Sequence, residues 1–586
     1  MTPQEITNLA DKFCEIDGIN RERFQKVLET ALTIHEAWNN GTKIVTVSAP
    51  TGFGKSILSM FLAFLEEEQS YILTSNLALQ DQYTRDIDRF KLDMASLKGA
   101  ANYQCNKDVT KNFGNRPCSP LTIKELKKKL PCAAECPYIN ARDSALNAST
   151  AVLNYAFFLT AASHWKSMMG GFNVRNLTIC DEGHLLPGLI QDAFSATLNI
   201  SSWPFMLSKL SGEWLLESRD ISKYVKEIIN CADTSGRYFE YFEKYRTEDS
   251  SKGVIQCLEA IKYHFDQLHS FTTPFQTVKT KEEMSKIEAV AMSTAGFCSG
   301  ISTKIGKLIS IFKMKPEAIV IDIHKSKEDG REEKFSVHFR CLDVSLIAED
   351  MFFQFTERCV IMSATMGNIK VFTEYLGIRS VHIDIESDFD FSKSPIYVGD
   401  LSMNYENRNA NFDEMVRQVD KILGHFQNES GIIHTGTKDF ATRLKQKSAY
   451  SDRLLAYSNS KEKAIALARM ERNPNKKFVL IGPSLIEGID LAGDKARFQI
   501  FMKVPYESLG DNFVKLTLKS APAVYSANAS NAIEQGTGRC IRSKDDWAET
   551  FILDSSYKKL LMQTGIPKNF TGRVKKIIES PIFSNS

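Results

Sequence analysis

The stretch that most restricts the fold of this 586-residue chain is "KIVTVSAPTGFGKSILSMFLAFLEE", close to the N-terminus. Lys43 to Val47 is rich in β-branched residues and predicts a strand, whereas Ile57 to Leu65 is an apolar run that predicts a buried helix face. A glycine-rich loop between a strand and a helix is the usual setting of a phosphate-binding loop. We therefore expect an α/β domain that binds a phosphorylated ligand here.

The loop, Ala49 to Ser56, matches the P-loop pattern except that alanine occupies the first glycine position. Gly52 and Gly54 let the backbone close around phosphate oxygens, and the helix N-terminus attracts their charge. Lys55 is expected to reach the β- and γ-phosphates, and Ser56 to bind Mg²⁺. A glycine-rich turn that binds nothing is the alternative. The residues assigned to nucleotide binding are Pro50, Thr51, Gly52, Phe53, Gly54, Lys55 and Ser56.

An acidic tetrapeptide follows a second strand-like run, in "NLTICDEGHLL". A carboxylate at the C-terminal end of a strand can hold the Mg²⁺ shell, and its neighbour can polarise the attacking water. We assign Asp181 to the metal, Glu182 to the water, and His184 to coupling hydrolysis to movement. The tetrapeptide alone also fits a solvated turn, but together with a P-loop it indicates nucleoside triphosphate hydrolysis.

The C-terminal third again alternates short apolar runs with charged helical patterns, as a parallel α/β sheet requires. Within "AIEQGTGRCIRS", Gln535, Arg539 and Arg542 recur at spacings of four and three, which would place them on one helix face. Arginines brought across a domain cleft can neutralise charge that develops on the γ-phosphate. Two surface arginines on a helix are the alternative.

Taken together, these motifs resemble those of the XPD/DinG family of superfamily 2 DNA helicases, which carry an iron–sulfur cluster. The matching stretches are "APTGFGKS", "YILTSNLALQDQY", "DEGH", "VIMSATMG", "EGIDLAGD" with "FMKVPY", and "QGTGRCIR", in family order from about residue 20 to residue 555. The resemblance implies two RecA-like domains that bind ATP between them. It further implies that Gln25 reads adenine and that Glu487, Gly488 and Asp490 contribute to the nucleotide site.

Four cysteines, Cys105, Cys118, Cys132 and Cys136, fall in one short window of a chain that has twelve in all. No signal peptide is evident, so we expect a cytoplasmic protein, or a nuclear one in a eukaryote, whose clustered thiols bind metal rather than form disulfides. The family carries its iron–sulfur domain at this place between motifs, and four thiolates suffice for a [4Fe–4S] cluster. Zinc and unligated thiols are the alternatives.

The formal net charge is +2, so any nucleic-acid surface must be local. Residues 98–129 hold eight Lys or Arg against Asp108 and Glu125, a pattern that fits contact with a phosphate backbone or a solvated helix face. Tyr103, Phe113 and Tyr138 lie nearby and are expected to pack in a core rather than to stack on bases. No stretch predicts a membrane span.

The predicted fold class is α/β, with two RecA-like P-loop NTPase domains that contain parallel sheets, an inserted iron–sulfur domain and an inserted, mostly helical arch domain. We expect a monomeric ATP- and Mg²⁺-dependent helicase that moves 5′ to 3′ on single-stranded and forked DNA. The alternatives are an ATPase that remodels RNA or RNA–DNA hybrids, and an ATPase-switched scaffold of a repair or transcription assembly. The expected domains are motor domain 1 (1–95, 140–196 and 343–390), the iron–sulfur domain (96–139), the arch (197–342) and motor domain 2 (391–586).

Overall fold

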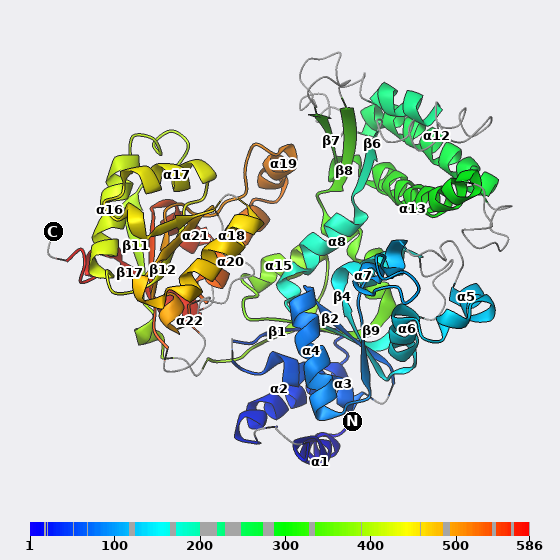
Figure 1. The fold of residues 1–586 in the computed structure, drawn as a ribbon, viewed down its shortest axis with the longest axis horizontal. Helices are drawn as coiled ribbons and strands as arrows, with labels where there is room; N and C mark the ends of the chain where they lie inside the picture. Colours follow the sequence, from blue (N-terminus) through cyan, green and yellow to red (C-terminus); the bar gives the residue numbers. More distant parts are fainter. Residues whose placement is uncertain are drawn as a thin grey trace.

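The computed structural model of the chain contains two parallel-sheet domains and a separate insertion (Figure 1). Domain 1 lies in the lower right of the view, domain 2 on the left, and the insertion above domain 1. The residues that the structure describes are 1–16, 19, 21–50, 52–66, 68–115, 123–164, 172–199, 220–228, 248–272, 286–326, 334–387, 390–457, 459–483, 493–538, 540–541, 546–563 and 568–584.

Domain 1 is built on a seven-stranded sheet whose strand pairs are all parallel. In spatial order its strands are β10 (Ser380–Asp384), β1 (Ile44–Ser48), β9 (Thr356–Ser363), β5 (Arg175–Cys180), β2 (Ser70–Thr74), β4 (Thr150–Asn154) and β3 (Met94–Leu97). The strands that end in the predicted motifs, β1, β5 and β9, are neighbours. Because the carboxyl ends of parallel strands meet at one edge, the fold gathers these motifs there.

The helices of domain 1 bury apolar faces against this sheet. They are α1 (Pro3–Cys14), α2 (Arg21–Asn39), α3 (Lys55–Leu65), α4 (Leu77–Phe90), α6 (Pro137–Asn147), α7 (Tyr155–His164), α8 (Leu186–Phe194) and α15 (Ile369–Leu376). Leu58, Met60, Phe61 and Leu62 of α3 are almost completely buried, as its apolar sequence predicts. The helix after the phosphate loop is therefore anchored in the core.

Domain 2 has a second seven-stranded, all-parallel sheet. In spatial order it contains β13 (Leu454–Ala456), β14 (Val479–Gly482), β12 (Gly431–His434), β15 (Phe498–Phe501), β16 (Glu549–Asp554), β11 (Ile396–Leu401) and β17 (Val574–Lys576). Its helices include α16 (Phe412–His425), α17 (Lys438–Lys447), α18 (Ser460–Arg472), α19 (Asn512–Ser520), α20 (Pro522–Thr537) and α21 (Ser556–Gln563). The predicted pair of parallel α/β domains is confirmed.

The insertion combines two long helices with a small antiparallel sheet. The helices α12 (Glu248–Thr272) and α13 (Lys286–Met314) pack on each other, and the sheet has the order β6 (Ala196–Asn199), β8 (Lys334–Cys341), β7 (Ile319–Ser326). The sequence predicted a mostly helical insertion. The sheet is the difference, and it joins β6 to a strand more than a hundred residues further along the chain.

Domain 2 contacts the rest of the chain through α19 and α20. Phe513 and Leu516 of α19 form an apolar cluster with Val320 and Leu342 at the base of the insertion. Beside this cluster, Arg340 donates to Asp511 at 2.6 Å. The second contact joins α20 to α15 of domain 1 (Figure 1). Domain 2 is thus linked both to the insertion and to the strand-end region of domain 1.

Candidate nucleotide site and cysteine pocket

The phosphate loop lies between β1 and α3, as predicted. Gly52 and Gly54 adopt φ values of 88° and 102°, in the region that favours glycine. Gly54 is the N-cap of α3 and has no side chain that could accept from the first N–H groups of the helix. These N–H groups can therefore donate to a bound anion. Lys55 is the first residue of α3, and its ammonium donates to the carbonyl of Ala49 at 3.4 Å. Thr51 lies outside the described residues.

The acidic motif begins where β5 ends, beside β9, and β1 lies on the other side of β9. Asp181 is 2% exposed, and burial raises the pKa of its carboxyl, as does the neighbouring charge of Glu182, whereas Lys55 lowers it. One carboxylate oxygen, Oδ1, accepts the backbone N–H of Glu182 at 2.9 Å, and the other, Oδ2, accepts the hydroxyl of Tyr83 at 2.9 Å. Both oxygens of the proposed metal ligand therefore have a fixed direction.

Glu182 has an unusual backbone conformation for a side chain of its size. Its φ of 51° lies in the left-handed region that non-glycine residues seldom adopt. Such conformations cost roughly 1–3 kcal/mol and are concentrated at functional sites. The strain at Glu182 agrees with its assignment to the attacking water.

A hydroxyl from the neighbouring strand links Glu182 to His184. Ser363, at the end of β9, lies 2.7 Å from Nδ1 of His184 and donates to Oε2 of Glu182 at 3.3 Å. The backbone N–H of Thr365 donates to the same hydroxyl at 3.2 Å. The acidic motif and the "SAT" motif thus form one hydrogen-bonded group. The sequence pointed to both motifs but not to this contact.

Gly183 is held against β9 with no room for a side chain. A Cβ placed there would lie 2.4 Å from Cγ2 of Ile361 and 3.4 Å from the amide nitrogen of Met362. Contacts below 3.0 Å essentially never occur, so an alanine here would require the strand or the turn to shift. Glycine at this position therefore reflects close packing.

Gln25, the predicted adenine-reading residue, lies on α2 and donates to Oε1 of Glu29 at 3.1 Å. The same helix approaches the phosphate loop, because a Cβ on Gly54 would lie 3.9 Å from Cγ2 of Val27. This location is compatible with adenine contact, which stays a prediction. Glu487, Gly488 and Asp490 lie outside the described residues.

Domain 2 contributes α20, which carries Gln535. The helix ends at Thr537, and Cys540 and Ile541 are not helical. The glycines of "QGTGRC" account for the end of the helix at this point because glycine disfavours helix, and the predicted common face of Gln535, Arg539 and Arg542 stays a prediction. Arg539 and Arg542 themselves lie outside the described residues.

One turn before Gln535, α20 touches the loop that follows the "SAT" motif. A Cβ on Gly367 would lie 1.8 Å from Oδ1 of Asn531, so this contact depends on a glycine. Gly367 follows β9, whose last residue is Ser363. The structure thus connects the acidic motif, through Ser363 and its loop, to domain 2.

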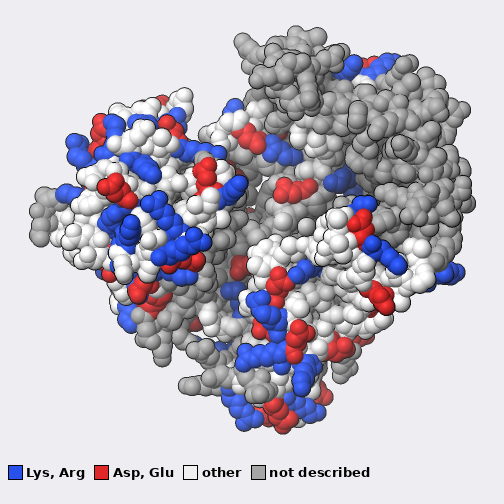
Figure 2. Space-filling model, in the orientation of Figure 1, with Lys and Arg blue, Asp and Glu red and all other residues white. Residues whose placement is uncertain are grey.

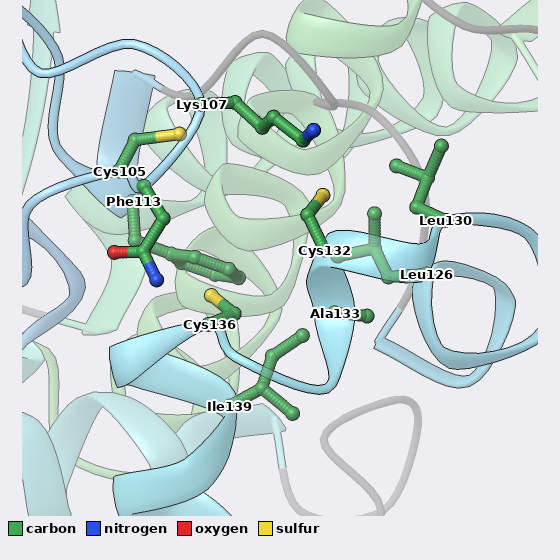
Figure 3. Close-up of a pocket in the computed structure, with 10 residues that line it drawn as sticks. Cys105, Lys107, Phe113, Leu126, Leu130, Cys132, Ala133, Cys136 and Ile139 are labelled. Carbon is green, nitrogen blue, oxygen red and sulfur yellow. The ribbon is translucent and has the colours of Figure 1, made fainter.

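The cysteine window lies beside α6, apart from the nucleotide site (Figure 1). Cys105, Cys132 and Cys136 line one pocket of about 380 Å³, part of which is open to solvent. Their sulfur atoms point toward this pocket from two segments of the chain, one that contains Cys105 and one that contains Cys132 and Cys136 (Figure 3). The pocket walls include Phe113, Leu126, Leu130, Ala133 and Ile139.

The donor type and the apolar walls suit a thiolate-bound group. However, within the described ranges no three His, Cys, Asp or Glu residues are grouped closely enough to hold a metal ion. Cys118 lies outside the described residues, so the predicted set of four ligands stays a prediction. The hydrogen bond from Asn106 to the carbonyl of Glu135, at 2.5 Å, joins the segment of Cys105 to that of Cys136.

The aromatic and basic residues of the window have mostly structural roles. Phe113 and Tyr138 are buried and stacked, with ring centroids 4.1 Å apart, as the expectation of core packing requires. Lys98 pairs with Asp81, and Lys127 pairs with Asp143. These ion pairs reduce the basic excess expected for residues 98–129. In Figure 2, the visible face of domain 2 carries Lys and Arg side chains with Asp and Glu side chains between them.

Among the helices that the structure describes, none has the combined length and apolar composition needed to cross a bilayer.

Comparisons with known proteins agree with the motifs. A helicase C-terminal domain family matches residues 432–573. The chain is 21% identical to the ATP-dependent DNA helicase YoaA of Escherichia coli strain K12, over 92% of each protein. It is 20% identical to the ATP-dependent DNA helicase DinG of Photobacterium profundum, over 92% of this chain and 94% of that protein.

Solved structures show the same fold. The alignment with the structure of an XPD helicase covers 95% of this chain and 99% of that protein, with a TM-score of 0.57 and 15% identity. Xpd4 of S. tokodaii covers 94% of this chain, with a TM-score of 0.51 and 13% identity. The fold is that of XPD, with two RecA-like domains, and the resemblance to the XPD/DinG helicases is confirmed.

Proposed function

We propose that this chain is an ATP-dependent DNA helicase that moves 5′ to 3′ on single-stranded DNA and unwinds duplexes. The observation that supports it best is the hydrogen-bonded group of Glu182, His184 and Ser363 beside a phosphate loop. This group belongs to a chain that resembles named DNA helicases over nine-tenths of its length. Such a site can hydrolyse ATP and transmit the result to a neighbouring domain.

In this proposal, ATP binds at the carboxyl ends of the strands of domain 1, and domain 2 then closes over the bound nucleotide. The N–H groups at the start of α3, together with Lys55, bind the phosphates. Ser56 and Asp181 offer the oxygen ligands that Mg²⁺ prefers, and the bound ion would neutralise phosphate charge. Glu182 orients and polarises the attacking water.

The path from chemistry to motion passes through Ser363. Loss of the γ-phosphate changes the surroundings of Glu182 and His184, both of which contact Ser363. The loop after Ser363 touches Asn531 on α20 through Gly367. A small change at the acidic motif can therefore alter the contact between domain 2 and domain 1. When the two domains bind and release the DNA backbone in turn, this domain movement becomes stepwise translocation.

We further propose that Cys105, Cys118, Cys132 and Cys136 hold a [4Fe–4S] cluster. Support comes from the three described thiols that face one pocket, and from the place of the window between the motor motifs. Hydrolysis needs no electrons, so the cluster's contribution is structural: it holds together short segments that have little regular structure of their own.

The test is unwinding of 5′-tailed and 3′-tailed DNA duplexes by anaerobically purified protein, with iron and sulfide measured in the same sample. We expect ATP-dependent unwinding of the 5′-tailed substrate and about four iron atoms per chain. Unwinding of the 3′-tailed substrate alone would contradict the proposed direction. Zinc in place of iron would contradict the cluster.

A second measurement distinguishes DNA from RNA as the track. Because a motor that follows the backbone reads little sequence, its ATPase rate in the presence of single-stranded DNA or RNA is the direct comparison. We expect stronger stimulation by DNA. Equal or greater stimulation by RNA would favour an RNA or RNA–DNA hybrid remodeller, and ATPase activity without unwinding would favour a scaffold.

A further inference from the structure

A fully buried tyrosine hydroxyl lies directly behind the proposed metal ligand. Tyr83, the last residue of "LTSNLALQDQY", lies on α4 and is 0% exposed. Its ring packs in the apolar core of domain 1 together with Ile72, Ile179 and Met362. An isolated hydroxyl in such a place would cost free energy, so its partners must compensate for the lost water.

Those partners belong to the two nucleotide-binding motifs. The Tyr83 hydroxyl lies 2.9 Å from Oδ2 of Asp181 and 2.9 Å from Oγ of Ser59, which is on α3 one turn after Ser56. A carboxylate can only accept, so the single phenolic proton is donated to Asp181. Ser59 therefore accepts nothing from Tyr83, but its own single proton can be donated either to the Tyr83 oxygen or to the carbonyl of Lys55, 3.0 Å away.

We propose that Tyr83 is a positioning residue for the Mg²⁺–nucleotide site. The proposal rests on the nucleotide site proposed above and adds a residue that touches neither metal nor nucleotide. Glu182 fixes one oxygen of Asp181 through its N–H, and Tyr83 fixes the other. With both oxygens held, the carboxylate cannot rotate freely.

The arrangement also joins three elements that carry the site. Tyr83 comes from α4, Ser59 from the phosphate-loop helix α3, and Asp181 from the end of β5. One hydroxyl therefore sets the distance between the helix that follows the phosphate loop and the acidic motif. A site that is arranged before its ligand arrives avoids part of the cost of ordering, and so binds more tightly.

The test replaces Tyr83 by phenylalanine, which keeps the ring and removes the hydroxyl. The matched control is Tyr71→Phe: Tyr71 is equally buried in domain 1, and its hydroxyl donates to the carbonyl of Asn173 at 2.8 Å rather than to Asp181. The readout is the affinity for a fluorescent ADP analogue, measured with Mg²⁺ and again with EDTA. No turnover is needed.

We expect Tyr83→Phe to weaken binding about tenfold in Mg²⁺ and less than twofold in EDTA, as loss of one hydrogen bond to a charged group predicts. Tyr71→Phe should bind like the wild type under both conditions. In ATPase assays, the Mg²⁺ concentration for half-maximal rate should rise for Tyr83→Phe, with a smaller change in kcat at saturating Mg²⁺.

Equal losses with Mg²⁺ and EDTA, or wild-type affinity in both, would overturn the proposal. If Tyr83→Phe does not fold, Ser59→Ala provides the second variant, because it removes the other partner of the same hydroxyl. Ser59→Ala should lose less affinity for the ADP analogue than Tyr83→Phe, again in Mg²⁺ and not in EDTA. If Ser59→Ala shows no loss that is specific to Mg²⁺, the proposal is overturned. A wild-type protein that binds no Mg²⁺–nucleotide would instead contradict the nucleotide site itself.

Discussion

The nucleotide site and the cysteine window are assembled in different ways. At the nucleotide site, regular strands and helices bring Asp181, Glu182 and Ser363 together, and side-chain hydrogen bonds fix them. In the window, Cys105 lies next to an isolated bridge, and Cys132 lies in a 3₁₀ turn. Hydrogen bonds within the protein therefore arrange the first region, whereas the second has little regular structure and, in our proposal, is held together by the cluster.

The largest effect is expected at the phosphate loop. Lys55→Ala removes the ammonium that we propose binds the β- and γ-phosphates, so ATPase activity should fall at least about a thousandfold. Steady-state phosphate release measures it. Iron content should equal that of the wild type, because the two regions are assembled independently. Near-normal turnover would show that Lys55 has another role.

The converse change is Cys132→Ser. It removes one thiolate, so we expect iron to be lost and unwinding to fall at least tenfold. Binding of the ADP analogue in Mg²⁺ should stay within twofold of the wild type. Iron analysis, unwinding and nucleotide binding on one preparation test this prediction. Unchanged iron content would remove Cys132 from the ligand set.

A buried carboxyl next to Gln535, Glu534 of α20, makes the stability of domain 2 sensitive to pH. Burial raises the pKa of Glu534 from its ordinary value of 4.5 to about 7, and Ser530 lies 3.2 Å from it. The folded state therefore binds the Glu534 proton more tightly than the unfolded state does. The resulting contribution to the free energy of unfolding is fully present below pH 4.5 and is lost as the pH rises to about 7.

Glu534→Gln should remove this decline and raise stability at pH 8 by up to roughly 3 kcal/mol. Thermal unfolding from pH 5 to pH 8 measures the slope, and iron content over the same range is the control. A wild-type Tm that does not fall between pH 5 and pH 7 would contradict the buried neutral carboxyl.

The smallest effect is expected from Gly183→Ala. The added Cβ would meet Ile361, at a cost of about 1–3 kcal/mol, and would displace His184 from Ser363. We expect ATPase activity to fall several-fold without any loss of iron. Adding Ile361→Ala should restore much of the activity, because it removes the clashing atom; a double-mutant cycle with no coupling would contradict the packing argument.

The sequence was sufficient where a motif is local. The phosphate loop, the acidic motif and the two parallel sheets follow from short patterns whose strand or helix context is visible in neighbouring residues. Contacts between distant segments were not predictable in this way. The hydrogen bond between His184 and Ser363 joins residues 179 positions apart, and nothing in either motif specifies it.

Two differences have clear physical reasons. The antiparallel sheet of the insertion was missed because β6 pairs with β8 across most of the insertion, and four residues alone give no strand signal. The helix end at Thr537 was missed because spacing alone suggested a longer helix, although Gly536 and Gly538 disfavour one. Tyr83 gave no signal, since an aromatic residue on an apolar helix face is usually core.

One measurement tests the difference between the two regions most directly. Wild-type protein is treated with ferricyanide to destroy the proposed cluster, desalted, and assayed for unwinding of a 5′-tailed duplex and for ADP-analogue binding in Mg²⁺. We predict that unwinding is lost while the nucleotide affinity stays within twofold of the untreated protein. If nucleotide affinity is lost together with iron, or if unwinding survives without iron, the independent assembly of the two regions is contradicted.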